Sequence, residues 1–116
     1  MRELVKVFKA LSDETRLRIL NLLLEGECCV CEVMQVLAIS QTRASRNLSA
    51  LYDAGFLKLR KEGLWSLYSI NRDCTEDYCS HLLDVVRKAL GSNKVIDSDR
   101  ERLRKAERVG PGCVTQ

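Results

Sequence analysis

Hydrophobic positions in the first half of the chain recur at intervals of three and four residues, the spacing of amphipathic helices. This spacing predicts helices over residues 2–11 and 14–24, and a short helix over 29–37. Ser40 offers a side-chain cap for a fourth helix, which Gly55 ends. The pattern therefore predicts four consecutive helices.

The period of the pattern changes after Gly55. Apolar residues alternate with polar ones on both sides of the turn RKEGL (residues 60–64), which predicts a β-hairpin. A last amphipathic helix fits about residues 75–90. The predicted fold class is mostly α with a β-hairpin. Two short helices with a tight connection and then a hairpin are typical of a winged helix-turn-helix.

The composition shifts beyond Asn93. The segment DSDRERLRKAERVGPGCVTQ (97–116) is dense in charge and nearly free of large apolar residues, which predicts a flexible tail with transient helix. We therefore expect a winged helix-turn-helix domain over residues 1–91 and a flexible polar C-terminal tail over residues 92–116.

The composition is that of one globular domain. The chain has 116 residues, of which 46% are hydrophobic and 30% charged. It contains neither a run of 18 apolar residues nor the apolar region of a secretory signal, so we expect a cytoplasmic protein with no membrane partner. Thiols stay reduced in the cytosol, so the six cysteines indicate ligands or redox groups rather than disulfides.

The fourth predicted helix and the hairpin carry side chains suited to DNA. The net charge of +3 decides nothing alone, but a local cationic excess from Ser40 to Gly63 suits either a phosphate backbone or a solvated face. In a winged helix-turn-helix the second helix of the pair enters the major groove of double-stranded DNA. The predicted DNA contacts are Ser40, Gln41, Thr42, Arg43, Ser45, Arg46 and Asn47 on the helix, and Arg60 and Lys61 on the wing. Aromatic residues are only 5% of the chain, which disfavours stacking on single strands.

The stretch ECCVCEVM (27–34) places three thiols, Cys28, Cys29 and Cys31, within four positions. Thiolates select soft ions, and the start of a helix lowers thiol pKa values. The spacing is not that of structural zinc sites, and the one histidine, His81, suits a surface or interface position. Three sulfurs without a fourth ligand suit As(III) or Sb(III). The competing interpretation is that these cysteines are small buried hydrophobes.

Taken together, these motifs make residues 1–91 resemble the ArsR/SmtB family of metal-responsive repressors. ALSDETRLRIL (10–20) is similar to the family's second helix, SQTRASRNLSALYDAGFL (40–57) to its recognition helix, and RKEGLWSLYSI (60–70) to its wing. The resemblance implies a homodimer built from the first and last helices, which reads an inverted repeat in operator DNA.

The cysteine stretch is similar to the motif of the arsenic-sensing branch of that family. Cys29 and Cys31 match its first two cysteines, whereas Met34 stands where its third usually lies. Cys28 is the first candidate for the third sulfur, and Cys113 is the second. The resemblance implies a repressor of an arsenic-resistance operon that As(III) or Sb(III) releases from its operator, without an organic cofactor.

Other functions are left open by the residues alone. A repressor of the same fold could respond to thiol oxidation or to zinc or cadmium. A thiol oxidoreductase would need a βαβ context, which the pattern lacks, so we do not expect an enzyme. An interaction module with a structural ion would unfold on chelation.

Overall fold

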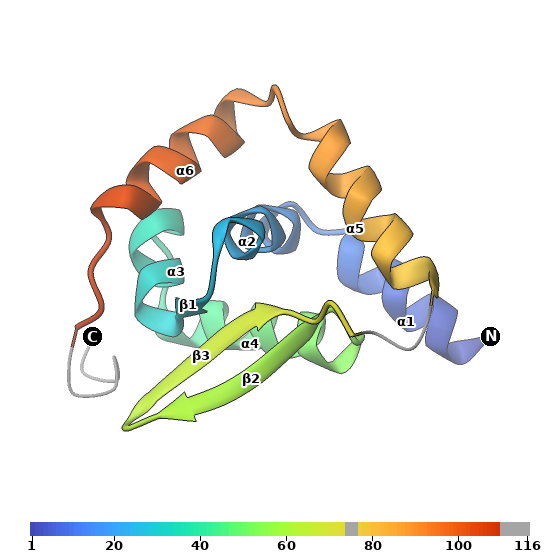
Figure 1. The fold of residues 1–116 in the computed structure, drawn as a ribbon, viewed down its shortest axis with the longest axis horizontal. Helices are drawn as coiled ribbons and strands as arrows, with labels where there is room; N and C mark the ends of the chain where they lie inside the picture. The colour runs from blue at the N-terminus through green and yellow to red at the C-terminus, as the bar shows by residue number, and fades with distance from the viewer. Residues whose placement is uncertain (74–76, 110–116) are drawn as a thin grey trace.

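We describe the fold from a computed structural model of the chain, which defines residues 1–73 and 77–109 (Figure 1). These residues form six helices and one antiparallel sheet of three strands. The elements are α1 (Arg2–Leu11), α2 (Glu14–Glu25), β1 (Cys28–Cys29), α3 (Val30–Leu37), α4 (Gln41–Asp53), β2 (Leu57–Glu62), β3 (Trp65–Ile70), α5 (Asp77–Ala89) and α6 (Lys94–Lys105). The predicted class, mostly α with a β-hairpin, is confirmed.

The helix boundaries follow from local caps. The Asp13 side chain accepts a hydrogen bond from the Arg16 N–H at 3.1 Å, and the Ser40 hydroxyl accepts one from the Arg43 N–H at 3.1 Å. These bonds satisfy amides that the first turns of α2 and α4 leave without helical partners. Ala38 ends α3 in the left-handed conformation (φ 55°, ψ 49°). The resulting tight turn leads directly into α4 and completes the helix-turn-helix pair.

The wing is the predicted hairpin, with Gly63 at its turn in a positive-φ conformation (φ 60°). The strands β2 and β3 pair from Leu57 opposite Ile70 to the turn. On its other edge β3 pairs with β1, a strand that the sequence analysis did not predict because two residues show no readable alternation. This third strand brings the cysteine motif into the same sheet as the wing.

The helix α6 lies where the sequence predicts a flexible tail, and that prediction is wrong for residues 94–105. The side chain of Asn93 caps the helix by accepting the Ile96 N–H at 3.2 Å. Ile96 is buried, and Asp99, only 1% exposed, accepts two hydrogen bonds from Arg18 of α2 at 2.9 and 2.8 Å. These long-range contacts leave no periodic signal in the sequence.

The helix α2 lies at the centre of the molecule (Figure 1). Its buried residues Ile19, Leu20 and Leu22 share one hydrophobic core with Leu48 of α4 and Phe56. The helices α5 and α6 pass over α2 as an arch, with α6 above α3 and α5 beside α1 (Figure 1). The arch therefore joins the cysteine-bearing side of the molecule to the opposite end.

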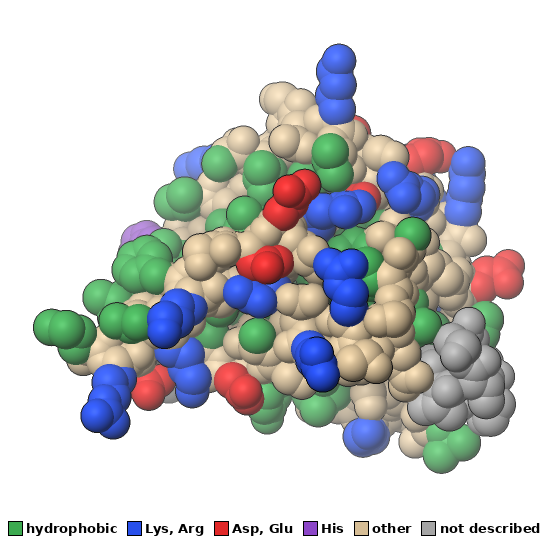
Figure 2. Space-filling view, turned by 180° about the vertical axis from the view of Figure 1, so that it is seen from behind, with side chains coloured by type: hydrophobic (Ala, Val, Ile, Leu, Met, Phe, Trp, Pro, Cys, Tyr) green, Lys and Arg blue, Asp and Glu red, His purple; other side chains and the backbone are tan. Residues whose placement is uncertain are grey.

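The end of the molecule formed by α1 and α5 exposes large apolar side chains. Phe8 is 53% exposed and Val85 60% exposed, and Leu4 and Val5 are also exposed. Seen from behind, hydrophobic side chains gather at this end (Figure 2). A cluster of this kind marks an interaction surface. None of the described helices is long and apolar enough to cross a membrane.

Candidate functional site

The polar side of α4 is open to solvent. Thr42, Arg43 and Arg46 are exposed, whereas Gln41 and Ser45 are partly exposed. Arg46 makes no hydrogen bond or ion pair with another described residue. Lys and Arg side chains are spread over the face seen from behind, with fewer acidic ones between them (Figure 2). Such side chains can reach the phosphates and base edges of a duplex.

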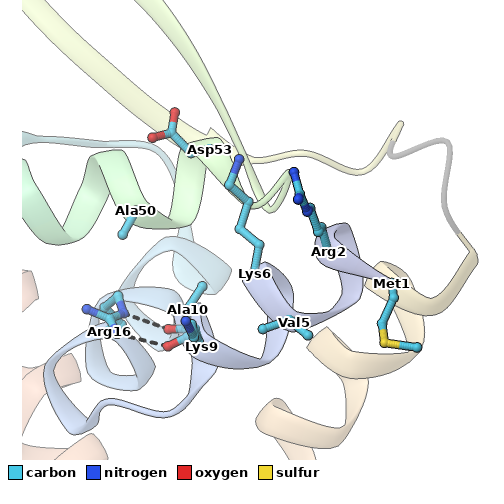
Figure 3. Close-up of a pocket in the computed structure, with 9 residues that line it drawn as sticks. All are labelled: Met1, Arg2, Val5, Lys6, Lys9, Ala10, Arg16, Ala50 and Asp53. Carbon is cyan, nitrogen blue, oxygen red and sulfur yellow. Dashed lines mark hydrogen bonds between the residues drawn. The ribbon is translucent and has the colours of Figure 1, made fainter.

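Asn47 lies on the same helix but is held by its neighbours. Its Oδ1 accepts a hydrogen bond from Arg16 Nη1 at 3.1 Å, and its amide donates to the Arg43 carbonyl at 2.9 Å. Arg16 also donates to the carbonyls of Lys9 and Ala10 at 2.9 and 2.7 Å (Figure 3). One guanidinium thus ties α1, α2 and α4 together. In this conformation Asn47 links α4 to α2, and one amide N–H of its partly exposed side chain is not used by these two hydrogen bonds.

A groove of about 650 Å³ opens between α1 and α4 beside Arg16 (Figure 3). Its lining combines cationic and apolar side chains with one carboxylate: Met1, Arg2, Val5, Lys6, Lys9, Ala10, Arg16, Ala50 and Asp53. None of these residues was predicted as part of a site. Because Val5 also belongs to the exposed apolar side of α1, the groove continues into that surface.

The two predicted wing cations are both exposed but differ in their contacts. The Lys61 ammonium donates to the Ser66 hydroxyl at 2.7 Å. The Arg60 guanidinium donates to both carboxylate oxygens of Glu27 at 2.7 and 2.8 Å and pairs with Glu62 at 2.8 Å. The hydrogen bond from Arg60 lowers the pKa of the Glu27 carboxyl below its ordinary value. Arg60 is therefore engaged by two carboxylates of its own chain.

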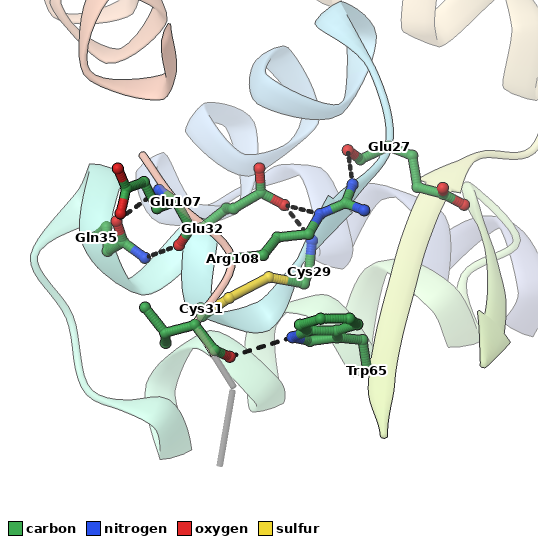
Figure 4. The surroundings of a disulfide bond; sticks show 9 residues. Glu27, Cys29, Cys31, Glu32, Gln35, Trp65, Glu107 and Arg108 are labelled. Atoms are coloured by element: carbon green, nitrogen blue, oxygen red, sulfur yellow. Dashed lines mark hydrogen bonds and ion pairs between the residues drawn. A yellow bond between two sulfur atoms is a disulfide. The ribbon is translucent and has the colours of Figure 1, made fainter. Parts of the chain in front are cut away.

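Two of the three motif cysteines come together. Cys29 and Cys31 are joined by a disulfide, with Cα atoms 5.4 Å apart (Figure 4). They form a small buried cluster with Leu67, against which the side chains of Trp65 and Val109 pack. The indole Nε1 of Trp65 donates to the Val109 carbonyl at 3.1 Å. The sulfur pair is therefore enclosed between α3, the wing and the chain that follows α6.

Cys28 faces the other way. Adjacent residues of a strand point to opposite sides, and Cys28 belongs to the main core whereas Cys29 belongs to the small cluster. Its thiol donates to the Gly26 carbonyl at 3.6 Å. Burial, followed by the Glu32 carboxylate, raises the pKa of the Cys28 thiol to about 12. The expectation that the helix start lowers the pKa is thus wrong for Cys28, since desolvation outweighs the helix dipole there.

A segment that the sequence analysis did not single out closes over the cysteine motif. We call residues 107–109 the C-terminal clasp. Glu107 exchanges two backbone hydrogen bonds with the Gln35 side chain, at 2.6 and 3.1 Å. Arg108 donates to Glu32 Oε1 at 3.0 Å and to the Glu27 carbonyl at 3.3 Å. Only the charge density of the tail hinted at these contacts, which join residues more than seventy positions apart (Figure 4).

The remaining candidate ligands are dispersed. Cys79 is buried, and His81 is exposed on α5, as expected for a surface or interface residue. Cys74 and Cys113 lie outside the described residues. Among residues 1–73 and 77–109, no three His, Cys, Asp or Glu side chains gather closely enough to hold a metal ion.

The helix pair α3–α4, the exposed cations of α4 and the β2–β3 hairpin define a winged helix-turn-helix protein of the DNA-binding class. Residues 13–59 match the model of the family described as "Bacterial regulatory protein, arsR family". The chain belongs to the ArsR family. The predictions of a transcriptional regulator with this fold, and not an enzyme, are thereby confirmed.

Individual relatives agree with this membership. The chain is similar to a cadmium resistance transcriptional regulatory protein CadC homolog of Staphylococcus aureus, with 42% identity over 75% of this chain and 67% of that one. It is 46% identical to the arsenical resistance operon repressor of Escherichia coli (strain K12), over 58% of each chain. The homodimeric winged helix-turn-helix domain of Mb0332 from Mycobacterium bovis has a TM-score of 0.65 and 30% identity, over 80% of this chain and 82% of that one.

Proposed function

We propose that the protein is a homodimeric repressor of an arsenic-resistance operon, released from double-stranded operator DNA when As(III) or Sb(III) binds its cysteine thiolates. The observation that carries the proposal is the enclosed pair Cys29 and Cys31 at the start of α3, the helix that leads into the recognition helix. The name of the Escherichia coli relative, an arsenical resistance operon repressor, supports this choice.

The donor set suits the inducer. Once reduced, Cys29 and Cys31 offer two soft sulfurs in an apolar enclosure, which favours soft ions over magnesium or calcium. Binding of arsenous acid to three thiols forms three As–S bonds and releases three waters, so no oxidant or reductant is consumed. The enclosing Leu67 and Trp65 side chains keep competing water away from the sulfurs.

The third sulfur is Cys28 or Cys113. Cys28 would have to leave the main core and turn toward the small cluster. Cys113 follows Val109 by four positions, and four residues span at most about 14 Å. Because Val109 already packs on the sulfur pair, we favour Cys113. Comparing Cys28→Ser with Cys113→Ser in an arsenite-binding titration decides between the two.

The exposed side chains of α1 and α5 support the dimer. Phe8 and Val85 expose apolar surface at the end of the molecule formed by α1 and α5, away from the Cys29–Cys31 pair (Figure 1). A symmetric dimer formed there would present two α4 helices to successive major grooves, as half-sites one helical turn apart require. The predicted DNA contacts of α4 and the wing residue Lys61 lie on exposed or partly exposed surface suited to this.

Coupling follows from the position of the motif. Drawing three sulfurs onto one ion moves the first turn of α3, and the tight turn at Ala38 passes that movement to residues 40–47. Because two recognition helices must match two half-sites simultaneously, a small displacement weakens DNA binding. Linkage is reciprocal, so operator binding weakens ion binding by the same factor.

Fluorescence anisotropy of the reduced protein on its own promoter DNA tests the proposal. Titration with arsenite should release the DNA, whereas zinc and cadmium, added in parallel, should not. Release by cadmium alone would favour the function named for the Staphylococcus aureus relative. Binding that ignores all three ions would overturn the inducer assignment and leave the DNA-binding role in place.

A second candidate, thiol oxidation as the trigger, is favoured by the Cys29–Cys31 disulfide. A hydroperoxide would oxidise the two thiols to the disulfide while it is itself reduced to an alcohol and water. Release of DNA by peroxide without arsenite, reversed by dithiothreitol, would support this function. Arsenite release that persists under strictly reducing conditions would argue against it as the main trigger.

A further inference from the structure

The wing cation Arg60 is held by the segment that precedes the paired cysteines. Glu27 lies immediately before β1, and its two carboxylate oxygens receive two parallel hydrogen bonds from Arg60 at 2.7 and 2.8 Å. Bidentate pairs of this kind have fixed geometry and are stronger than single contacts. Because the Glu27 side chain is only 26% exposed, the carboxylate has a defined position from which to hold the wing.

Two routes connect this ion pair with the sulfur pair. Within the sheet, Cys29 lies opposite Leu67, which lies opposite Arg60, so all three share one cross-strand row. Through hydrogen bonds, Arg108 donates to the Glu27 carbonyl and to the Glu32 carboxylate, and Glu32 Oε1 also accepts the Cys29 N–H at 2.8 Å. A movement of Cys29 is therefore transmitted to Glu27 by covalent, sheet and clasp contacts.

We propose that Glu27 competes with a DNA phosphate for Arg60 and thereby couples the state of the cysteine pair to the wing. The inference rests on the proposed function, and it adds Glu27 to that function as a positioning residue. Arg60 already donates to Glu27 and Glu62, so it cannot bind a phosphate in a bidentate manner without leaving a carboxylate. In the structure Arg60 is bound by both carboxylates while the two sulfurs are joined, and the proposal assigns this arrangement to the state that withholds Arg60 from DNA.

Glu62 provides a matched control for Glu27. Both carboxylates pair with Arg60, at distances of 2.7 to 2.8 Å. Glu62, however, lies at the end of β2 opposite Trp65, and its side chain is 57% exposed. No hydrogen bond or ion pair of the described residues links it to Cys29 or Arg108. Glu62→Gln therefore changes the charge beside Arg60 without touching the connection to the cysteines.

The first measurement is the salt dependence of binding to a promoter duplex by anisotropy, with no inducer and with protein in which the Cys29–Cys31 disulfide is formed. Glu27→Gln should make the slope of log K against log salt more negative by about 0.9, the value for one additional phosphate contact. The variant should thus lose about 3.5-fold more affinity than wild type between 50 and 200 mM salt. In an Arg60→Gln background the same change should leave the slope unaltered. If Glu27→Gln changed the salt slope equally in the Arg60→Gln background, the change would be a general effect of charge. That result would overturn the proposed competition for Arg60.

The second measurement is the ratio of operator affinities before and after arsenite. Glu27→Gln should reduce this ratio relative to wild type, whereas Glu62→Gln should leave it unchanged. Equal ratios in wild type and Glu27→Gln would overturn the coupling role. A wild type that ignores arsenite would overturn the proposed function instead, and the salt comparison, which needs no inducer, would still decide whether Glu27 competes for Arg60. Thermal unfolding curves check that all variants are folded.

Discussion

Replacement of Asp99 by alanine should loosen the helix α6 from the rest of the molecule. The Asp99 carboxylate is 1% exposed, and its two hydrogen bonds come from an Arg18 side chain that is 21% exposed. Removing one partner of a fully buried pair costs about 3–5 kcal/mol. Arg18 can regain water after the loss, so we expect a smaller destabilisation of about 2–3 kcal/mol.

Urea denaturation followed by circular dichroism measures this change at a fixed protein concentration, because dimerisation makes stability concentration-dependent. With a urea slope of about 1–3 kcal/mol per molar, the midpoint should fall by about 0.7–3 M. Asp97→Ala is the control, since Asp97 lies on the same helix, is 59% exposed and forms its one described ion pair with Arg100 of that helix. Its effect should stay within about 0.5 kcal/mol. Equal losses in the two variants would refute the assignment of Asp99 as the anchor of α6.

Three further changes test the DNA and inducer assignments. Arg46→Ala should weaken operator binding, make the salt slope less steep by about 0.9 and leave arsenite binding intact, because Arg46 is exposed and makes no hydrogen bond or ion pair with another described residue. Unchanged affinity would contradict its role. Cys29→Ser should retain operator binding, since serine also caps α3, but abolish release by arsenite in the anisotropy assay; normal release would contradict the ligand assignment. Ser40→Ala should lower the unfolding free energy by about 1 kcal/mol in urea titrations through loss of the α4 cap, and an unchanged midpoint would argue against that cap.

The parts of the fold that could be predicted from the sequence are those whose causes are local. Asp13 and Ser40 cap the helices that follow them, and Gly63 permits the turn of the wing. The helix α6 could not be predicted in this way. Its stability depends on Asp99 meeting an arginine 81 positions away, and its large apolar side chains are few in a segment dense in charge.

The candidate site was predictable in its residue types but not in its arrangement. The close spacing of thiols pointed to Cys29 and Cys31, which the fold brings together. The spacing did not show that Cys28 faces the other way, because that difference arises from the unpredicted strand β1, in which neighbouring side chains point to opposite sides. Likewise, the sequence identified Arg60 as a wing cation but did not indicate that Arg60 forms an ion pair with Glu27.

The enclosure of the sulfur pair has a consequence for the speed of the response. Cys29 and Cys31 are 0% and 1% exposed, and Val109 of the clasp packs on them. A reagent from solution therefore reaches the sulfurs only after the clasp or α6 opens, a local event that needs less free energy than global unfolding. At high inducer concentration the observed rate in stopped-flow experiments should reach a plateau equal to the rate of opening. The rate at which the clasp opens is thus expected to set an upper limit on the rate at which any reagent reacts with these sulfurs, whatever its concentration.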